Sequence, residues 1–226
     1  MGFPAAPRGQ RETGRDGVSD FFLIRHASHD LLDRTIAGRM AGVRLSEKGR
    51  EEAEELADRI SEAGITEIHA SPRERAQETA AALGRRLNLA VKTNAALDEV
   101  DFGDWTGRSF GELQNDAAWK IWTHKRSEAR VPNGEIFADV QKRVVAEIQR
   151  LAVLHETGRI VLASHGDVIR AALLHYLAMS LDQIERLIVG PAALSLIAVG
   201  RDWAQVRLMN DTGLFSTKPR TRGCLH

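Results

Sequence analysis

Two adjacent basic side chains, Arg25 and His26, follow a short apolar run at residues 21–24. An apolar run of this length, bounded by polar residues, predicts a buried strand of a parallel sheet. Open α/β sheets bind ligands just beyond the carboxyl ends of their strands, so both side chains are expected at a binding site. The same pattern also fits a strand that ends in two solvated cations, and this stretch alone does not decide between the two.

Two further expected strands end in polar groups of the same kind. Because the carboxyl ends of parallel strands share one edge of a sheet, these groups are expected to converge with the first pair. Arginine binds paired phosphate oxygens through its planar guanidinium, and histidine can attack phosphorus or donate a proton. The chemistry that fits is phosphoryl transfer through a phosphohistidine. The groups are Ser71, Arg73 and Arg75 after the strand expected at residues 65–70, and His165 and Gly166 after the strand expected at residues 159–164.

Two loops carry the remaining candidate groups. Residues 97–107 interleave bulky apolar side chains with four carboxylates. A carboxyl group set among apolar side chains can have the raised pKa that a general acid needs. A packed loop with solvated acids fits this segment equally well. The segment that follows residue 28 is expected to line the site entrance, where Arg34, Arg39 and Arg44 suggest a second anionic group on the substrate, although an ordinary basic surface loop would look the same.

The elements that must position these groups alternate between strand and helix patterns. This alternation predicts an α/β fold with a mostly parallel central sheet. Ser46 and Ser71 are the expected N-caps of two of the helices, and Pro72 is expected in a first turn. A third strand is expected at residues 89–92 and a β-hairpin at residues 193–209. The helices are expected at residues 46–60, 73–87, 110–125 (one or two helices), 135–155, 167–176 and 181–188.

Length and composition limit the possible functions. The chain has 226 residues, of which 43% are hydrophobic, and this fits a single domain with a substantial core. Thirty-one basic residues balance 31 acidic ones, so the formal net charge is +0 and neither a nucleic acid nor a membrane surface is expected as a partner. The single cysteine, Cys224, excludes an intramolecular disulfide and fits the reducing cytoplasm. Residues 1–19 are expected to be flexible and are not a secretory signal, and residues 212–226 are expected to form a loose tail.

Several other chemistries lack their motifs. The chain contains no HExxH, no paired CxxC and no histidines at metal-ligand spacing, so no metal site is predicted. It also contains no G-x-x-x-x-G-K-[ST] phosphate loop and no G-x-S-x-G nucleophile turn. A cluster of arginine and histidine can supply the charge that metal ions supply elsewhere in phosphoryl transfer. No cofactor is therefore expected.

Six motifs in the same order resemble the histidine phosphatase superfamily, also called phosphoglycerate mutase-like. The resemblance runs from about residue 20 to residue 209, and it implies a three-layer α/β/α fold over a domain at residues 20–211. Each motif alone is weak, whereas six in order are specific. They are LIRHA at residues 23–27, LSEKGR with the following Glu52 and Ala53, ASPRERAQETA at residues 70–80, LDE with FGDWTG within residues 97–107, PNGE at residues 132–135, and SHG at residues 164–166.

The resemblance also implies roles for individual residues. His26 is expected to be the nucleophile, Arg25 and Arg75 to clamp the phosphate, and His165 to hydrogen-bond it. Glu99 is expected to protonate the leaving oxygen and then to activate water. Gly166, Ser28 and Arg39 are further candidates for substrate binding.

Three positions depart from the family pattern. Ala27 replaces the usual glycine, Ser28 stands where many members have glutamate, and Leu32 stands where many phosphatases have asparagine. None of these changes removes an expected catalytic group. They leave the substrate undefined.

The implied activity is that of a phosphoric monoester hydrolase of the histidine acid phosphatase type, branch 1, acting on a small phosphorylated substrate. A cofactor-dependent phosphoglycerate mutase is the first alternative, but classical mutases carry a longer insertion before Pro132, which here comes about 25 residues after Gly107. Protein-phosphohistidine phosphatases are shorter and generally lack the Glu99 loop. A non-catalytic binding module is a further alternative. Pairing of the strand near Trp203 between two copies of the chain would give a homodimer.

Overall fold

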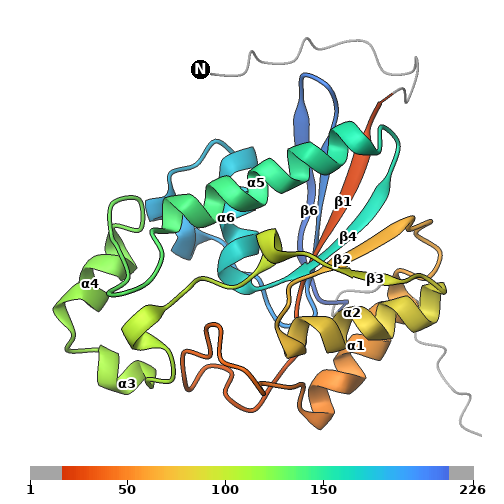
Figure 1. The fold of residues 1–226 in the computed structure, drawn as a ribbon. Helices are drawn as coiled ribbons and strands as arrows, with labels where there is room; N and C mark the ends of the chain where they lie inside the picture. The colour runs from red at the N-terminus through yellow and green to blue at the C-terminus, as the bar shows by residue number, and fades with distance from the viewer. Residues whose placement is uncertain (1–16, 214–226) are drawn as a thin grey trace, which may run out of the picture.

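The computed structural model describes residues 17–213 and shows six strands in one central sheet with helices on both of its faces (Figure 1). The strands are β1 (Ser19–Arg25), β2 (Glu67–Ala70), β3 (Val91–Thr93), β4 (Arg159–Ser164), β5 (Leu194–Val199) and β6 (Ala204–Asp211). The helices are α1 (Glu47–Arg59), α2 (Glu74–Leu87), α3 (Phe110–Leu113), α4 (Ala117–His124), α5 (Phe137–Leu154) and α6 (Gly166–Tyr176). Short 3-10 helices are η1 (Ala95–Leu97), η2 (Gly103–Trp105) and η3 (Leu181–Arg186). The expectations for residues 1–16 and 214–226, including Cys224, lie outside the described residues.

The sheet has the strand order β3-β2-β4-β1-β5-β6 and is mostly parallel, as expected. Strands β1 to β4 run parallel to one another, and β5 and β6 are antiparallel to their neighbours. Arg25 at the end of β1 is in register with Ser164 at the end of β4, and Ala70 at the end of β2 pairs with Ala163. The residues that follow these three strands therefore emerge side by side.

The central strands are apolar along their whole length because both faces of the sheet are covered. Phe21 and Leu23 of β1 belong to the core beneath α5 and α6, whereas Phe22 and Ile24 belong to the core beneath α1 and α2. Figure 1 shows these two helix pairs on opposite faces of the sheet. The expected three-layer α/β/α arrangement is confirmed.

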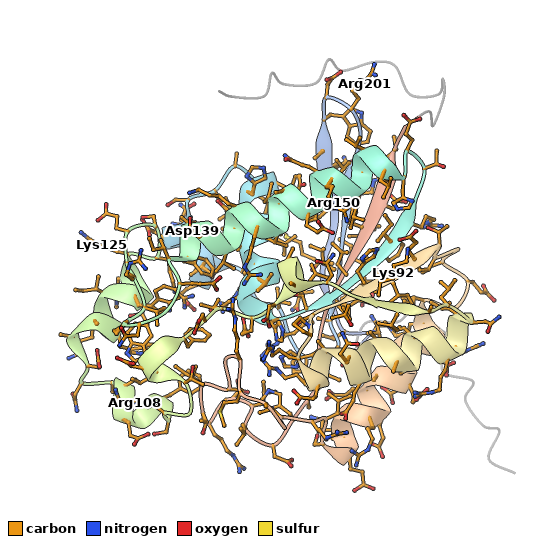
Figure 2. The ribbon with its side chains drawn as sticks, in the orientation of Figure 1. Lys92, Arg108, Lys125, Asp139, Arg150 and Arg201 are labelled. Carbon is orange, nitrogen blue, oxygen red and sulfur yellow. The ribbon has the colours of Figure 1, made fainter. Side chains whose placement is uncertain are left out.

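Helices α3 and α4 form a lobe beside the sheet (Figure 1). Arg108 and Lys125 lie on this lobe (Figure 2). Aromatic rings hold this lobe in place. Trp122 is fully buried and meets the rings of Trp105 and Phe137 edge-to-face, with centroids 5.8 and 5.6 Å apart. Such pairs stabilise beyond the area that they bury. Trp105 and Trp122 therefore belong to the core.

The start of α1 agrees with the sequence, because the Ser46 hydroxyl accepts a hydrogen bond from the backbone N–H of Gly49 at 3.1 Å. Gly49 also allows a close backbone approach, since a Cβ at this position would lie 1.9 Å from the carbonyl oxygen of Ser28. The start of α2 differs from the expectation. Arg73 rather than Ser71 is the N-cap residue of α2. The hydroxyl of Ser71 lies 2.8 Å from Nε2 of His165 and also accepts from the backbone N–H of Arg73 at 3.3 Å.

One other element differs in its detail, because the segment expected as a helix at residues 181–188 is the shorter 3-10 helix η3. The segment at residues 110–125 forms two helices, which is one of the two expected possibilities. Arg201 lies at the tip of the hairpin that joins β5 to β6 (Figure 2). Strand β6 is at the edge of the described sheet and exposes Leu208 and Met209, and Trp203 directly before this strand is exposed as well. Pairing of β6 between two copies of the chain stays a prediction.

Candidate active site

His26 lies directly after β1, and its backbone N–H donates to the carbonyl oxygen of Ser164 at 2.9 Å. Its side chain lines a cavity although the residue is only 2% exposed. Nδ1 lies 2.9 Å from the carbonyl oxygen of Ala27. Because a carbonyl oxygen only accepts hydrogen bonds, Nδ1 carries the ring proton and Nε2 carries the lone pair. Burial, followed by the nearby charges of Arg75 and Arg25, lowers the pKa of His26 well below its usual value, so the ring is neutral and nucleophilic.

Arg25 and Arg75 line the same cavity and present donors that have no acceptor among the described residues. Nη1 of Arg25 donates to the carbonyl oxygen of Val189 at 2.6 Å, while its buried Nε is unpaired. Nη2 of Arg75 donates to the carbonyl oxygen of Gly38 at 2.8 Å, while its buried Nε and Nη1 are unpaired. A buried unpaired donor costs about 1–3 kcal/mol. These unpaired donors therefore favour the binding of a ligand that brings hydrogen-bond acceptors into the cavity.

Gly166 also lines the cavity and lies against the guanidinium of Arg25. A Cβ at this position would lie 3.3 Å from Nε of Arg25, which is tighter than an ordinary contact. The glycine thus leaves room for the arginine at the start of α6. A role of Gly166 in substrate binding stays a prediction.

Glu99 follows η1 and directs its carboxyl group into the cavity. Oε1 accepts a hydrogen bond from the backbone N–H of Val100 at 2.9 Å, and Oε2 lies 3.8 Å from Nη2 of Arg75 and 3.6 Å from Nδ1 of His165. Burial, followed by the charge of Asp167, raises the pKa of Glu99 to about 7. A carboxyl group that titrates near neutral pH can give and take protons, as general acid–base catalysis requires.

His165 lies behind His26 rather than on the cavity wall, with ring centroids 5.2 Å apart. Nδ1 of His165 accepts from Nη2 of Arg75 at 3.1 Å, and Nε2 donates to the hydroxyl of Ser71 at 2.8 Å. Burial and the charge of Arg75 lower the pKa of His165 well below its usual value. The sequence predicts that His165 hydrogen-bonds the phosphate. In this structure both of its nitrogens already have protein partners.

A third imidazole, that of His29, lines the cavity at a ring distance of 5.2 Å from His26. Its buried Nδ1 has no partner among the described residues. Burial and the charges of Arg75 and Arg25 lower the pKa of His29 to about 4, so the ring is neutral. Sequence reasoning missed this residue. Its position three residues after His26, on the loop expected at the site, was the available signal.

Ser28 and Arg39 do not line the cavity. The backbone N–H and the hydroxyl of Ser28 donate to the carboxylate of Glu52 at 2.8 and 2.9 Å. The guanidinium of Arg39 lies between three carboxylates and also donates to the backbone oxygen of Glu99 at 2.9 Å. These carboxylates are Asp98, Asp101 and Glu135 at 3.5, 3.7 and 3.0 Å. Arg39 therefore holds the Glu99 loop in this structure, and neither side chain lies in the position expected for substrate binding.

The structure also shows the positions of Ala27 and Leu32, the other two residues that depart from the family pattern. Ala27 donates its backbone N–H to the hydroxyl of Thr79 at 3.0 Å, and Leu32 lines the cavity. Arg44 pairs with Glu78 at 2.9 Å on the surface. Arg34 and Arg44 do not line the cavity either. The expected second-anion site is thus not formed by the arginines of this loop.

The cavity has a volume of about 430 Å³ and extends well beyond the strand ends. This volume holds a small organic ligand rather than a phosphate alone. Its wall combines apolar side chains with a second charged cluster. The apolar side chains include Leu32, Ile36, Phe110, Trp119, Leu187 and Ile188, and the charged cluster is formed by Arg126, Asp167, Arg170 and Glu185.

Within residues 17–213 no cluster of three or more histidine, cysteine, aspartate or glutamate side chains could hold a metal ion. Over the same residues, no helix has the length and apolar character needed to cross a membrane.

The central sheet, its two helical layers and the position of the cavity at the strand ends define a phosphoglycerate mutase-like fold. Residues 21–212 match the model of the histidine phosphatase superfamily (branch 1), and the chain belongs to this superfamily.

Named relatives are similar over most of this chain. The 2,3-bisphosphoglycerate-dependent phosphoglycerate mutase of Thermoplasma acidophilum is 31% identical over 183 residues, covering 78% of this chain and 86% of the mutase. The bifunctional protein Rv2228c of Mycobacterium tuberculosis is 31% identical over 206 residues, covering 89% of this chain. The match spans only 56% of the length of Rv2228c. The solved structure of the alpha-ribazole phosphatase from Shigella flexneri has a TM-score of 0.75 and 25% identity, covering 85% of this chain and 97% of that one.

Proposed function

We propose that this protein is a phosphatase that hydrolyses a small phosphomonoester through a phosphohistidine on His26. One observation carries the proposal. His26, a neutral and buried imidazole with its lone pair on Nε2, lines the same cavity as Arg25 and Arg75, and three buried nitrogens of these arginines have no acceptor among residues 17–213. A phosphoryl group bound to these donors would place its phosphorus within reach of the imidazole, and its oxygens would satisfy the arginines.

The reaction takes place in two displacements. In the first displacement, Nε2 of His26 forms a bond to phosphorus while the ester P–O bond breaks. The electron pair of the P–O bond leaves with the alcohol oxygen, and this oxygen takes the proton of Glu99. In the second, ionised Glu99 removes a proton from water, whose oxygen bonds to phosphorus as the P–N bond breaks. Inorganic phosphate leaves, and both side chains return to their starting states. Proton transfer of this kind contributes about 10²–10⁴ in rate.

The lowered pKa of His26 agrees with an enzyme of the histidine acid phosphatase type. A nucleophilic imidazole must be neutral, and the lowered pKa of His26 keeps it neutral in mildly acidic solution. Arg75 lies in the cavity wall and donates to Nδ1 of His165, which lies behind it, at 3.1 Å. In this proposal Arg75 steadies the charge on the transferring group, and His165 holds the guanidinium of Arg75 in place.

The relatives support both a hydrolase and a transferase. The alpha-ribazole phosphatase from Shigella flexneri favours hydrolysis, and the mutase of Thermoplasma acidophilum supports the alternative of a phosphoglycerate mutase. We favour hydrolysis because the segment between Gly107 and Pro132 is short. The volume of the cavity also leaves room for a leaving group beside the phosphate.

The proposal is tested by a phosphatase assay with 4-nitrophenyl phosphate in the presence of a chelator. Wild-type protein is expected to release phosphate and to yield an acid-labile phosphohistidine after rapid quenching. His26→Ala is expected to lose both, whereas the exposed His124→Ala is the matched control. Activity that survives in His26→Ala would refute the phosphohistidine route. With 2-phosphoglycerate as substrate, 3-phosphoglycerate in place of free phosphate would establish the mutase instead.

A further inference from the structure

The imidazole of His29 lines the cavity beside His26, and the reaction proposed above gives it no role. Its ring centroid is 5.2 Å from that of His26, and the ring of His165 lies at the same distance. These two neighbours differ in their contacts. Both ring nitrogens of His165 have protein partners, whereas Nδ1 of His29 is buried and has no partner among residues 17–213. His29 is only 7% exposed, so its imidazole is a buried polar group that still has hydrogen bonds to make.

The loop that carries the two cavity imidazoles is held in place along its length. The backbone N–H of Ala27 donates to the hydroxyl of Thr79 at 3.0 Å. The N–H and the carbonyl group of Ser28 bind to α1 and its N-cap residue. The carbonyl oxygen of His29 accepts from the backbone N–H of Leu32 at 3.0 Å, which closes a turn. The backbone therefore fixes the separation of the two rings before a ligand binds, as a preorganised site requires.

The nitrogens of the His29 ring determine which ligand group it can bind. Because Nδ1 is buried away from solvent, Nε2 is the nitrogen that can face the cavity. Burial, followed by the charges of Arg75 and Arg25, lowers the pKa of His29 to about 4, so the ring carries a single proton at neutral pH. A neutral imidazole has one donor nitrogen and one acceptor nitrogen. A ligand that only accepts hydrogen bonds therefore selects the tautomer with the proton on Nε2.

We propose that His29 is a phosphate-binding residue, which donates its Nε2–H group to an oxygen of the phosphoryl group that His26 attacks. This inference rests on the proposed phosphatase function and adds a binding residue to the same site. Reacting atoms in a productive complex are about 3–3.5 Å apart, so a phosphoryl group beside Nε2 of His26 brings its oxygens near the neighbouring ring. Ionised phosphoryl oxygens only accept hydrogen bonds and match the Nε2–H tautomer.

The contact adds an uncharged donor to the charged donors of the site. Arg25 and Arg75 present three buried nitrogens without acceptors among residues 17–213. Leu32, which closes the turn with His29, lines the cavity with an apolar side chain and offers no donor from it. Two guanidinium charges balance the two negative charges of a phosphate monoester. The neutral imidazole adds a hydrogen bond without adding a third cation.

Two amide substitutions identify the nitrogen that makes the contact. The side-chain nitrogen of glutamine reaches the position of Nε2, whereas that of asparagine reaches the position of Nδ1. In calorimetry with inorganic phosphate, His29→Gln is expected to bind within about threefold of wild type, and His29→Leu and His29→Asn about ten- to a hundredfold more weakly, the range of a hydrogen bond to a charged group. His175→Leu changes an exposed histidine outside the cavity and is the control.

Wild-type affinity for phosphate in His29→Leu would overturn the proposal, and so would a loss in His29→Gln as large as that in His29→Asn. Thermal unfolding shows whether each variant is folded, and the comparison of the two amides decides the matter if His29→Leu does not fold. In nitrogen-15 NMR spectra, inorganic phosphate is expected to shift Nε2 of His29, a signal assigned by its absence from His29→Gln. A signal that saturating phosphate leaves unshifted would also overturn the contact.

Phosphate binding and turnover separate this inference from the proposed function. Phosphate affinity that depends on His29, in a protein that hydrolyses no phosphate ester, would refute the phosphatase and support the contact. Hydrolysis of 4-nitrophenyl phosphate together with wild-type phosphate affinity in folded His29→Leu would support the phosphatase and refute the contact.

Discussion

The hydroxyl of Ser71 lies 2.8 Å from Nε2 of His165 and is a hydrogen-bond partner of that imidazole on the side away from Arg75. Because Nδ1 of His165 accepts from Arg75, Nε2 must be the donor to Ser71. The Ser71 hydroxyl then directs its own hydrogen toward Oδ1 of Asp98 at 3.4 Å. A serine that sequence patterns assign to a helix cap thus contacts a histidine that lies beside His26, the proposed nucleophile.

The first prediction concerns this serine. Ser71→Ala removes the acceptor of the Nε2–H group of His165 and leaves a buried donor unpaired, at a cost of about 1–3 kcal/mol. We expect kcat/KM to fall about tenfold, and Nε2 of His165 to shift in nitrogen-15 NMR spectra because its N–H group loses its acceptor. Ser61→Ala, on the surface after α1, is the control. An unchanged Nε2 shift in Ser71→Ala would contradict the role of this hydrogen bond.

The second prediction concerns the proton of Glu99. Its pKa of about 7 means that the carboxyl group is protonated below this pH and ionised above it. Protonation of the leaving oxygen therefore weakens as the pH rises through 7. With an alkyl phosphate, kcat/KM of the wild type is expected to fall over this range, and Glu99→Gln is expected to lose about 10²–10⁴ in rate below pH 7.

With 4-nitrophenyl phosphate the loss in Glu99→Gln is expected to be much smaller, because this leaving group departs without a proton. A series of aryl phosphates, measured from pH 5 to 9 with both proteins, gives the dependence on leaving-group pKa. An equal loss for every leaving group would exclude Glu99 as the general acid.

The third prediction concerns the unpaired donors of Arg75. Its buried Nε and Nη1 are expected to bind phosphate oxygens, and hydrogen bonds to charged groups contribute about 1.5–3 kcal/mol each. Arg75→Met is expected to weaken the binding of inorganic phosphate by at least about tenfold in calorimetry. Arg85→Met changes an exposed arginine on the same helix and serves as the control. Thermal unfolding shows whether each variant is folded, and unaltered phosphate affinity in folded Arg75→Met would contradict the assignment.

The fourth prediction concerns stability at the start of α1. Gly49→Ala places a Cβ 1.9 Å from the carbonyl oxygen of Ser28, so backbone must move. We expect the free energy of unfolding to fall by about 1–3 kcal/mol, although alanine favours helix over glycine by about 1 kcal/mol. At Gly111 in α3 the nearest atom to an added Cβ is 4.0 Å away, and Gly111→Ala is expected to be neutral or stabilising. Urea unfolding of both variants distinguishes the effect of the close backbone approach at Gly49 from the effect of helix propensity. A Gly49→Ala variant as stable as the wild type would contradict the packing argument.

The sequence by itself determined the sheet and the position of the central groups in it. An apolar run that ends abruptly in Arg25 and His26 predicts a strand covered on both faces, and backbone pairing between β1 and β4 then places His165 beside His26. The strand pattern depends on interactions of short range along the chain, and the pairing of β1 with β4, which are distant in the sequence, follows the regular backbone geometry of a parallel sheet. The apolar run and the basic residues that end it are visible in the sequence without knowledge of the partners of any side chain.

Only the tertiary structure decided which side chains face the cavity. Arg39 was expected at the substrate, but three carboxylates from the segments around residues 98–101 and 135 hold it elsewhere. Arg126 and Asp167 are 41 residues apart in the sequence and nevertheless form one buried ion pair. Ionisable side chains take the partners that packing brings within reach once they are removed from water. Segments distant in the chain supply those partners, so local sequence patterns predicted the strand ends but not the charged wall beside them.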